Sequence, residues 1–506
     1  MITRRFFVRK VFIALCIIAG CFTLVFPVTG CKAAEVPDFV QGLSIDAVSG
    51  LSEEVSAFTD VNVVPMNEEK ILRDQTVVVE DGRIVLIGSA NEVAVPEGAE
   101  HIPGNDGFLM PGLADMHMHI CQDWEDSVWP VSPRLLYITN GVTTIRDFGS
   151  VGESPLWVLR WRDEIETGSR IGPHIISAGE ILYASPLADP AASVRVNISS
   201  GFDFIKFYSY LSPEDFKAAA RTAHDLEIYT AGHIPFMVGL EGALSEGMNE
   251  VAHIEELPYS LLDYDVPAAY MDPQSWLIYM VDMAEEQLPI ENKFDEELFL
   301  QIFGIAVEEI LSRLKESETA VSTTLVLDEV IRLKLSQQSA FLSRPENIYL
   351  PASYIDSYLR GEEKHQLLCE GREALCLYKE GMDLYFMQQL YEQGVLLLLG
   401  TDAGTVGMGL VPGFAVHDEL QILVDNGLTP YEALRTSTVD AARIAGRITG
   451  DSGFGVVEEG FRADLLLVAG NPLIDVSVVR DLQGVMVSGK WFDRSTLDNM
   501  LTAAEK

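Results

Sequence analysis

Short strand-like segments alternate with helix-like segments through the middle of the chain, from residue 113 to residue 445. The strand-like segments are rich in apolar and β-branched residues and lie at residues 141–147, 174–178, 202–208, 228–232, 250–254, 322–326 and 395–400. Helices are expected between or after them, as at residues 213–224 and 430–445. Strands that alternate with helices form parallel sheets, because each helix returns the chain to the same edge. About eight such units predict an α/β fold of the (β/α)8 TIM-like barrel type.

Both ends of the chain carry short strands without intervening helices. Residues 76–88 contain two β-rich runs around Asp81-Gly82, a pair that is typical of a hairpin turn. A second β-rich stretch covers residues 463–492. Because both ends lack helical partners, they are expected to pair with each other. The sequence therefore predicts a small β-sandwich domain built from both chain ends.

Two stretches within the barrel region are longer than a barrel connection requires. Residues 258–320 and 330–394 are helix-rich and acidic, and we interpret them as insertions placed over the carboxyl ends of the strands. The predicted division of the chain is an export signal at residues 1–31, the first part of the β-sandwich at 36–112, the barrel at 113–445 and the second part of the β-sandwich at 446–506.

The first residues have the composition of an export signal. Residues 1–10 hold four basic side chains and no acid, and residues 11–30 are apolar. The double arginine resembles a twin-arginine signal, and the sequence that ends at Cys31 resembles a lipoprotein box whose cysteine is acylated. Cleavage two or three residues later, or retention as a signal anchor, are the alternatives. We expect an exported protein of the periplasm or cell surface that meets the membrane only through an N-terminal lipid anchor.

The net charge excludes one class of partner. The chain has 76 acidic and 35 basic side chains, which gives a net charge of −41. Nucleic acids are bound by surfaces rich in Lys and Arg, so no nucleic-acid partner is expected. Hydrophobic residues make up 48% of the chain, which is enough for a large folded core. The expected partner is a small-molecule substrate, and assembly into a homo-oligomer is left open.

Three of the six cysteines lie in the signal segment, and the others are Cys121, Cys369 and Cys376. Cys369 and Cys376 are seven residues apart in what reads as one helix. A rise of about 1.5 Å per residue would separate their Cα atoms by about 10 Å, too far for a disulfide. We therefore expect neither a disulfide nor a structural zinc motif.

Side chains with metal-binding chemistry follow several of the strand-like segments. The motif LADMHMH at residues 113–119 places His117 and His119 on one side of a strand, since side chains two residues apart share a face. Taken singly, such a histidine is more often a core residue, and a lysine in an apolar strand often reaches solvent from the strand end. The carboxyl ends of parallel barrel strands meet on one face, however, so these side chains are expected to converge there. The full set is His117, His119, Lys206, His233, His253 and Asp402.

The order of these residues resembles the amidohydrolase superfamily, in particular its imidazolonepropionase-like and Xaa-Pro-dipeptidase-like members with two metal ions. Supporting stretches are FLMPGL at residues 108–113, GVTTIRD at 141–147, TDAG at 401–404 and GFRADL at 460–465. The resemblance covers about residues 58–495 and departs in the helical insertions.

The resemblance implies a role for each ligand. Two divalent ions, with zinc as the expected metal, would share a bridging hydroxide that attacks the scissile carbonyl, and the outer ion would polarise that carbonyl. Asp402 would act as general acid and base. The implied ligand set is His117, His119 and Asp402 for the more buried ion, His233 and His253 for the outer ion, and a carbamylated Lys206 that bridges the two.

Two further residues are candidates for substrate binding. Tyr208 faces the same side of its strand as Lys206, and His417 follows soon after Asp402. A packed core tyrosine and a surface or helix-capping histidine are the ordinary alternatives. We interpret Arg146 and Asp147 as a structural ion pair.

The predicted activity is hydrolysis of an amide C–N bond in a small substrate such as a dipeptide, an N-acyl amino acid or a cyclic amide. The acidic insertions favour cationic dipeptides. One alternative is a mononuclear imidazolonepropionase-like lactam hydrolase or deaminase, although Lys206 argues against a single-metal site. Phosphotriester or lactone hydrolysis uses the same two-metal chemistry. An alternative of another class is a non-catalytic solute-binding lipoprotein, which would require degenerate ligands, whereas all six are intact.

Overall fold

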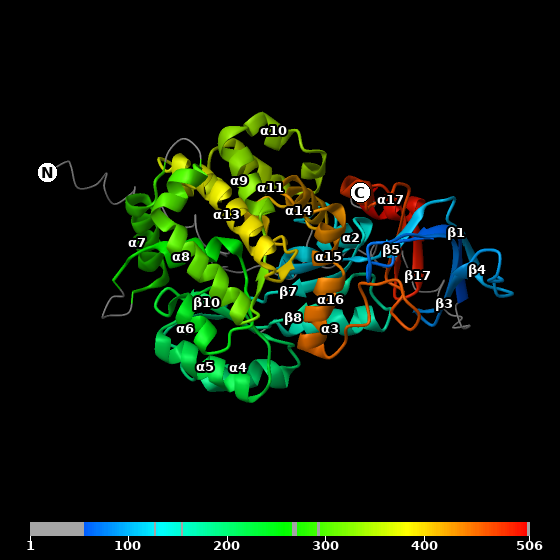
Figure 1. The fold of residues 1–506 in the computed structure, drawn as a ribbon, viewed down its shortest axis with the longest axis horizontal. Coiled ribbons are helices and arrows are strands. Elements are labelled where there is room, and N and C mark those ends of the chain that lie inside the picture. Colours follow the sequence, from blue (N-terminus) through cyan, green and yellow to red (C-terminus); the bar gives the residue numbers. More distant parts are fainter. Residues whose placement is uncertain (1–54, 126–127, 153–154, 266–270, 291–293, 503–506) are drawn as a thin grey trace, which may run out of the picture.

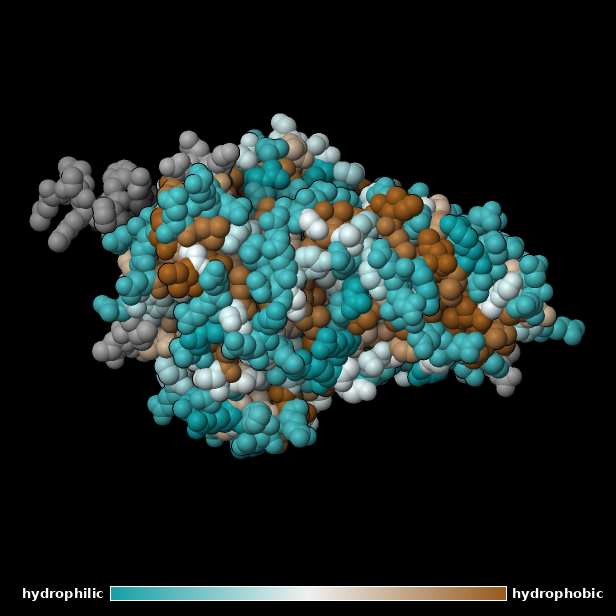
Figure 2. Space-filling view, in the orientation of Figure 1, coloured by the Kyte–Doolittle hydropathy of each residue, from teal (hydrophilic) through white to brown (hydrophobic). Residues whose placement is uncertain are grey.

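The computed structural model describes residues 55–125, 128–152, 155–265, 271–290 and 294–502. The export signal and lipoprotein box predicted at residues 1–31 lie outside this part of the chain. Within it, no helix is both long enough and apolar enough to cross a membrane. Figure 2 shows a mostly hydrophilic face with several apolar patches, one of which lies near α8 (Glu296–Glu316), where Ile302 and Ile305 are 53% and 86% exposed.

The middle of the chain forms parallel sheets, as the alternation of strands and helices predicts. The first sheet contains three strands in chain order, β6 (Leu113–Met118), β7 (Val142–Asp147) and β8 (His174–Ser177). The second contains six strands, also in chain order, β9 (Leu182–Ala184), β10 (Ile205–Tyr210), β11 (Thr230–Gly232), β12 (Glu250–Val251), β13 (Ala320–Ser322) and β14 (Leu397–Leu398).

Backbone hydrogen bonds connect the two parallel sheets at both edges. The Met116 amide donates to the Leu399 carbonyl at 2.8 Å, which joins β6 to the segment of β14. The Asp203 amide donates to the Ser177 carbonyl at 2.8 Å, which joins β8 to the start of β10. Gly400 permits the close approach at the first edge, because a Cβ there would lie 2.5 Å from the Cβ of His117.

Helices connect successive strands and surround them (Figure 1). They include α3 (Leu156–Glu166), α4 (Pro190–Ser200), α5 (Pro213–Asp225) and α6 (Gly239–Ser245). The sequence encodes several of their starts directly. Asp189 and Ser212 accept backbone N–H bonds at the first turns of α4 and α5, and each of these helices begins with proline. Such caps satisfy amides that have no partner within the helix.

The two stretches interpreted as insertions are helical. The first contains α7 (Pro273–Gln287) before α8, and the second contains α9 (Val326–Ser336), α10 (Gln338–Leu342), α11 (Ala352–Leu359), α12 (Lys364–Leu368) and α13 (Glu373–Gln393). The last helix of each stretch leads directly into the next strand, since β13 follows α8 and β14 follows α13.

Two predicted elements differ from the structure because of tertiary contacts: one is a strand that ends early, and the other is a helix that is interrupted. The strand expected at residues 322–326 stops at Ser322, since the Glu419 carboxylate accepts the Leu325 and Val326 amides and starts α9 there. The helix expected at residues 430–445 is divided into α15 (Pro430–Thr436) and α16 (Val439–Thr449). The division occurs where the Ser437 carbonyl accepts the Ala114 amide of β6 at 2.8 Å.

The prediction that Cys369 and Cys376 cannot pair is also wrong. The two residues form a disulfide, with their Cα atoms 6.4 Å apart. They do not share a helix, because α12 ends at Leu368 and α13 begins only at Glu373. The turn between the helices brings the two cysteines within bonding distance.

Strands from the two ends of the chain pair in one sheet, as predicted. It is an eight-stranded sheet, in which β5 (Phe108–Pro111) pairs antiparallel with β15 (Leu465–Val468) and thereby joins the two chain ends. The other strands are β1 (Val55–Val63), β2 (Leu72–Glu80), β3 (Arg83–Ser89), β4 (Glu100–Pro103), β16 (Leu482–Val487) and β17 (Lys490–Asp493).

The hairpin predicted around Asp81-Gly82 is confirmed, since β2 and β3 pair antiparallel across these two residues. The two separate sheets of a sandwich are not assigned in the described residues. Instead, the edge strand β3 returns to the other chain end, where the Ile84 amide donates to the Phe461 carbonyl at 2.9 Å. The sheet thus curls around its own apolar core.

Candidate metal centre

All six predicted ligands are buried, with at most 4% of any of them exposed. Five are close to strand ends, as expected: His117 in β6, His119 just after it, His233 directly after β11, His253 after β12, and Asp402 beyond β14. Lys206 differs from the prediction. It is the second residue of β10, and the strand continues past it to Tyr210.

The histidines and Asp402 form one compact group. Asp402 Oδ1 lies 3.5 Å from His117 Nε2 and 3.3 Å from His119 Nε2. The ring centroids of His253 lie 4.3 Å from His117 and 4.8 Å from His233. One ligand atom each from His117, His253 and Asp402 lies within 4.8 Å of the others. His253 therefore lies next to His117, a predicted ligand of the inner ion, and next to His233, a predicted ligand of the outer ion.

Lys206 lies near predicted ligands of both ions. Its Nζ is 4.6 Å from the centroid of the Phe148 ring, which stacks on His117 with centroids 3.8 Å apart. The same Nζ is 5.9 Å from the Tyr208 ring, whose centroid is 4.1 Å from that of His233. The Lys206 side chain thus lies near two aromatic rings, one packed against His117 and the other against His233.

Each histidine is oriented by a hydrogen bond at Nδ1. His117 Nδ1 bonds the Ala252 carbonyl at 2.8 Å, and His119 Nδ1 bonds the Gly149 carbonyl at 3.0 Å. His233 Nδ1 bonds the Glu256 carboxylate, and His253 Nδ1 bonds Thr324 Oγ1 at 3.0 Å. Because a backbone carbonyl can only accept, Nδ1 of His117 and of His119 donates, and the Nε2 lone pairs of these two rings stay available.

The Nε2 atoms of three of these histidines are suited to bind a metal ion. Among the described residues, Nε2 of His117, His233 and His253 is buried without a hydrogen-bond partner. Burial, followed by neighbouring positive charge, lowers the pKa of all three well below 6.5, so the imidazoles are neutral. Neutral imidazole nitrogens and a carboxylate are the ligands that zinc and similar divalent ions prefer. The donor set therefore fits a divalent metal.

Asp402 stays ionised despite its complete burial. Burial alone would raise its pKa, but the hydrogen bond from His119 and the positive charge of Lys206 lower it. Its backbone has φ of 56°, in the left-handed region that is unfavourable for a side chain other than glycine. The chain thus holds a strained residue at the centre of the cluster.

Sequence analysis missed the residues that support the ligands. Glu256 accepts the Ile234 amide at 3.1 Å in addition to its bond with His233, and burial raises its pKa to about 8. Asp115 accepts the Thr401 hydroxyl at 2.6 Å and ties the strand of His117 to the segment of Asp402, and burial raises its pKa to about 7. The sequence indicated these two residues only by their closeness to predicted ligands, since Glu256 follows His253 by three residues and Asp115 precedes His117 by two.

Arg146 and Asp147 do not pair with each other, contrary to our interpretation. Arg146 donates to Glu250 Oε2 at 2.8 Å and to the Met116 carbonyl at 2.6 Å. Asp147 accepts the Ser177 hydroxyl at 2.7 Å. Successive residues of β7 point to opposite sides, so adjacent side chains on a strand cannot meet.

The two candidates for substrate binding differ in position. Tyr208 is fully buried against His233, next to the predicted ligands. His417 lies in α14 (Phe414–Asp425), where burial and then the Arg480 charge lower its pKa to about 3. The charged groups that act on it are Arg480 and Asp418, and its role in substrate binding stays a prediction.

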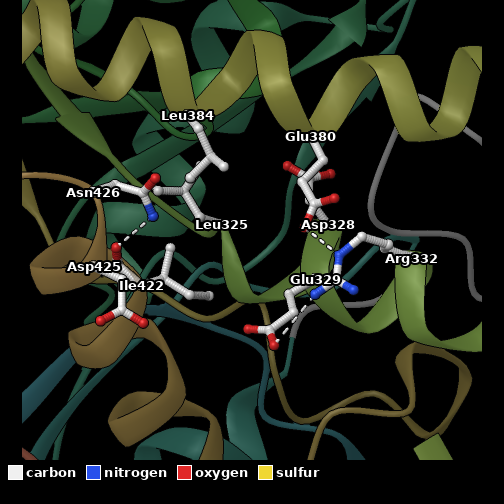
Figure 3. A pocket seen from close by; sticks show the side chains of 9 residues that line it. All are labelled: Leu325, Asp328, Glu329, Arg332, Glu380, Leu384, Ile422, Asp425 and Asn426. Atoms are coloured by element: carbon white, nitrogen blue, oxygen red, sulfur yellow. Dashed lines mark hydrogen bonds and ion pairs between the residues drawn. The ribbon is translucent and has the colours of Figure 1, made fainter. Parts of the chain in front are cut away.

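A cavity of about 180 Å³ lies between α9, α13 and α14 (Figure 3). None of the predicted site residues lines it. Arg332 projects into it and pairs with Glu380 at 2.7 Å, and Asp328 forms part of its wall. The cavity is therefore separate from the histidine centre.

Known proteins resemble this chain in both sequence and fold. A model of the amidohydrolase family matches residues 383–492. Imidazolonepropionase from Idiomarina loihiensis is 36% identical over 64 residues, which is 12% of this chain and only 16% of that protein. Ochratoxinase from Aspergillus niger is 21% identical over 491 residues, covering 82% of this chain and 81% of that enzyme.

Solved structures extend the similarity over most of the chain. An Xaa-Pro dipeptidase with bound methionine superposes with a TM-score of 0.59 and 18% identity, covering 87% of this chain and 100% of that one. Bottromycin amidohydrolase superposes with a TM-score of 0.61 and 21% identity, covering 89% and 90% of the two chains. At these identities the superpositions establish a common α/β fold.

Proposed function

We propose that this chain belongs to the amidohydrolase superfamily, whose family model matches residues 383–492, and that it is a metal-dependent hydrolase of an amide C–N bond in a small substrate. One observation carries the proposal. Four buried histidines are oriented through Nδ1 and gather around an ionised Asp402, and three of their Nε2 atoms have no hydrogen-bond partner in the described residues. Such atoms are costly to bury unless a ligand uses them.

We infer that the strands form a (β/α)8 barrel, residues 113–445, completed by a domain from the two chain ends, residues 36–112 and 446–506. The hydrogen bonds between β6 and the segment of β14, and between β8 and β10, support a closed ring. In a barrel the ligands would all lie at the carboxyl ends of the strands, where catalytic groups are found.

The proposed cofactor is a pair of divalent ions, with zinc expected from the imidazole and carboxylate donors. His117, His119 and Asp402 would hold the inner ion, and His233 and His253 the outer ion. Lys206 would bridge them as a carbamate, which its position between the two histidine pairs supports. When bound, the ions would supply activation of water and polarisation of the scissile carbonyl.

The chain's own residues then supply the proton transfers. Asp402 is ionised and buried, so it can accept a proton from the attacking water. Returning that proton to the leaving nitrogen completes C–N cleavage and restores the carboxylate. Hydrogen bonds to Ala252, Gly149, Glu256 and Thr324 keep the imidazole rings fixed during these steps. Tyr208, which packs against His233, is the proposed contact for the substrate or the tetrahedral intermediate.

The proposed substrates are dipeptides, N-acyl amino acids or cyclic amides. The structural relatives named above include an Xaa-Pro dipeptidase and an amidohydrolase, which supports an amide substrate. We retain the proposal that acidic insertions favour cationic dipeptides. Kinetics with neutral, acidic and basic dipeptides test it, and equal kcat/KM values across the three would contradict it.

A one-metal lactam hydrolase is the second candidate. Two observations favour it: the local match to imidazolonepropionase, and the grouping of His117, His253 and Asp402 within 4.8 Å, which is sufficient for a single ion. Lys206 favours two ions, since a bridging group has no role at a single ion.

We propose that the protein is exported through residues 1–31 and anchored by a lipid at Cys31. Metabolic labelling with a fatty acid analogue would mark the wild-type chain and leave a Cys31→Ala chain unmarked. Labelling of both chains would contradict the anchor.

Metal content per chain is the first test of the proposed function. The protein would be prepared with bicarbonate and Zn²⁺, and the released amine would be measured with dipeptides, N-acyl amino acids and lactams. Two ions per chain with amine release would support the two-metal amidohydrolase. One ion with lactam opening would favour the second candidate. No bound metal would contradict both and favour a solute-binding protein.

A further inference from the structure

A buried lysine in the second helical stretch contacts three carboxylates. Lys379 of α13 lies 2.5 Å from Asp328 Oδ1, 2.7 Å from Asp383 Oδ2 and 3.0 Å from Glu255 Oε2. None of these four residues is more than 8% exposed. We define this group as the Lys379 cluster.

Two members of the Lys379 cluster belong to segments that orient metal ligands. Glu255 lies in the short helix η4 (Ile254–Glu256), which begins directly after His253 and also carries Glu256. Glu256 bonds His233 Nδ1. The Lys379–Glu255 ion pair therefore holds the segment that fixes the ring of His233.

The second connection runs through α9. Asp328 lies in the first turn of this helix, four residues after Thr324. Thr324 bonds His253 Nδ1 at 3.0 Å and has φ of 52°, so its position is held by the surrounding structure. The Lys379–Asp328 ion pair therefore holds the segment that fixes the ring of His253.

The Lys379 cluster contains more carboxyl groups than ammonium groups. Three carboxylates contact one ammonium, and Glu255 Oε1 and Asp383 Oδ1 have no hydrogen-bond partner among the described residues. Buried ion pairs contribute little net stability compared with apolar packing. They do fix geometry, and here the fixed elements are the two that support His233 and His253.

We propose that Lys379 is a positioning residue for the outer half of the metal centre. It ties η4 and α9 to α13, and through Glu256 and Thr324 it sets the orientation of His233 and His253. The inner ligands His117 and His119 are oriented instead by backbone carbonyls, at Ala252 and Gly149, that do not belong to the Lys379 cluster. This inference rests on the proposed function, because it assumes that the centre binds metal.

The test is zinc binding by the full chain over a range of buffered free Zn²⁺ concentrations. Lys379→Met is expected to weaken the affinity for one of two ions by about 10- to 100-fold, as loss of a supporting residue does elsewhere, and to leave the other unchanged. Lys379→Arg, which keeps the positive charge, is expected to recover part of the affinity. The matched control is Cys369→Ser/Cys376→Ser, which alters the start of α13 without changing the cluster.

Each outcome decides the proposal. If wild-type protein binds two ions and Lys379→Met binds both with unchanged affinity, the positioning role is wrong and the proposed function stands. Equal weakening of both ions, or equal weakening in the disulfide control, would reduce the effect to general destabilisation and also overturn it. A wild-type chain that binds fewer than two ions overturns the inference together with the two-metal function. If Lys379→Met does not fold, Glu255→Gln is used instead, because it releases only η4. The same result is then expected, namely weaker affinity for one ion and unchanged affinity for the other.

Discussion

The histidine centre and the buried lysines of the second helical stretch are both polar and both buried, but they balance their charges differently. Lys379 and Lys334 supply their own cations to neighbouring carboxylates. The histidine centre instead retains Nε2 atoms without partners in the described residues, each costing about 1 to 3 kcal/mol. The comparison indicates that Lys334, whose charge is balanced by a carboxylate of the chain, has a structural role, whereas the Nε2 atoms of the histidine centre are suited to bind a ligand.

The largest expected effect comes from a substitution in the histidine centre. Asp402→Asn removes the proton acceptor and one charge of the ligand set, so turnover is expected to fall by about 10³-fold or more. The unfolding free energy should change little, because the carboxylate serves the reaction and not the core. Steady-state kinetics and urea unfolding measure the two quantities. Asp481→Asn, at an exposed position, is the control, and activity within tenfold of wild type in Asp402→Asn would contradict the assignment.

The next prediction concerns the buried ion pair between Lys334 and Glu363. Lys334 Nζ donates to Glu363 Oε1 at 3.1 Å and to the Met408 carbonyl at 3.0 Å, and both charged side chains are buried. Lys334→Met is expected to cost about 3 kcal/mol of unfolding free energy, because it leaves a buried carboxylate without its cation.

A second substitution makes this prediction sharper. Lys334→Met/Glu363→Gln removes both charges and is expected to regain part of the stability. Urea unfolding of wild type, Lys334→Met, Glu363→Gln and the double variant gives the coupling free energy. A coupling below about 0.5 kcal/mol would mean that the pair is not a stabilising unit.

The disulfide is expected to have a smaller effect within the same helical stretch. Cys369→Ser/Cys376→Ser opens a short loop, and the chain-entropy relation gives a loss of about 2 kcal/mol. Thermal unfolding with and without a reductant measures it, with Cys121→Ser as control. Identical midpoints for the double variant and wild type under oxidising conditions would contradict a stabilising disulfide.

The smallest effect is expected where the small domain meets the barrel, and it depends on pH. Burial alone would raise the pKa of Asp464, but His174 and Arg462 hold it well below 3.8. A depressed pKa stabilises the fold above the unfolded-state value, and that contribution is lost as the pH falls through the folded-state value.

Asp464→Asn is therefore expected to lose about 1 to 2 kcal/mol at pH 7. The difference from wild type should shrink as the pH falls below about 4. Unfolding free energies at pH 7, 5, 4 and 3 measure the trend. If the difference in unfolding free energy between wild type and Asp464→Asn grows as the pH falls, the stabilising role of ionised Asp464 is contradicted.

The sequence predicted those features that depend on residues close together in the chain. The period of two in LADMHMH placed His117 and His119 on one face, and the Asp81-Gly82 turn fixed the hairpin of β2 and β3. Alternation of strands and helices gave parallel sheets in chain order. The family resemblance gave the ligand set, which the structure gathers in one buried group.

Two of the errors below come from contacts between distant segments, and one comes from a turn that composition does not reveal. Glu419 starts α9 at Val326, 93 residues before it, where local pattern indicated a strand. Cys369 and Cys376 pair because a turn separates two helices that composition alone merges into one. Arg146 pairs with Glu250, 104 residues away, and not with its neighbour in sequence.

The sequence by itself identified the side chains that we propose as ligands and the strand ends near which most of them lie, because side-chain chemistry and strand period are local properties. Only the tertiary structure decided how each ligand is held. His117 is fixed by a carbonyl 135 residues away, and His253 by a threonine 71 residues away. Such partners depend on how helices and strands pack, and no local pattern encodes them. The same holds for Lys379, whose role follows from the three segments that meet at its ammonium group.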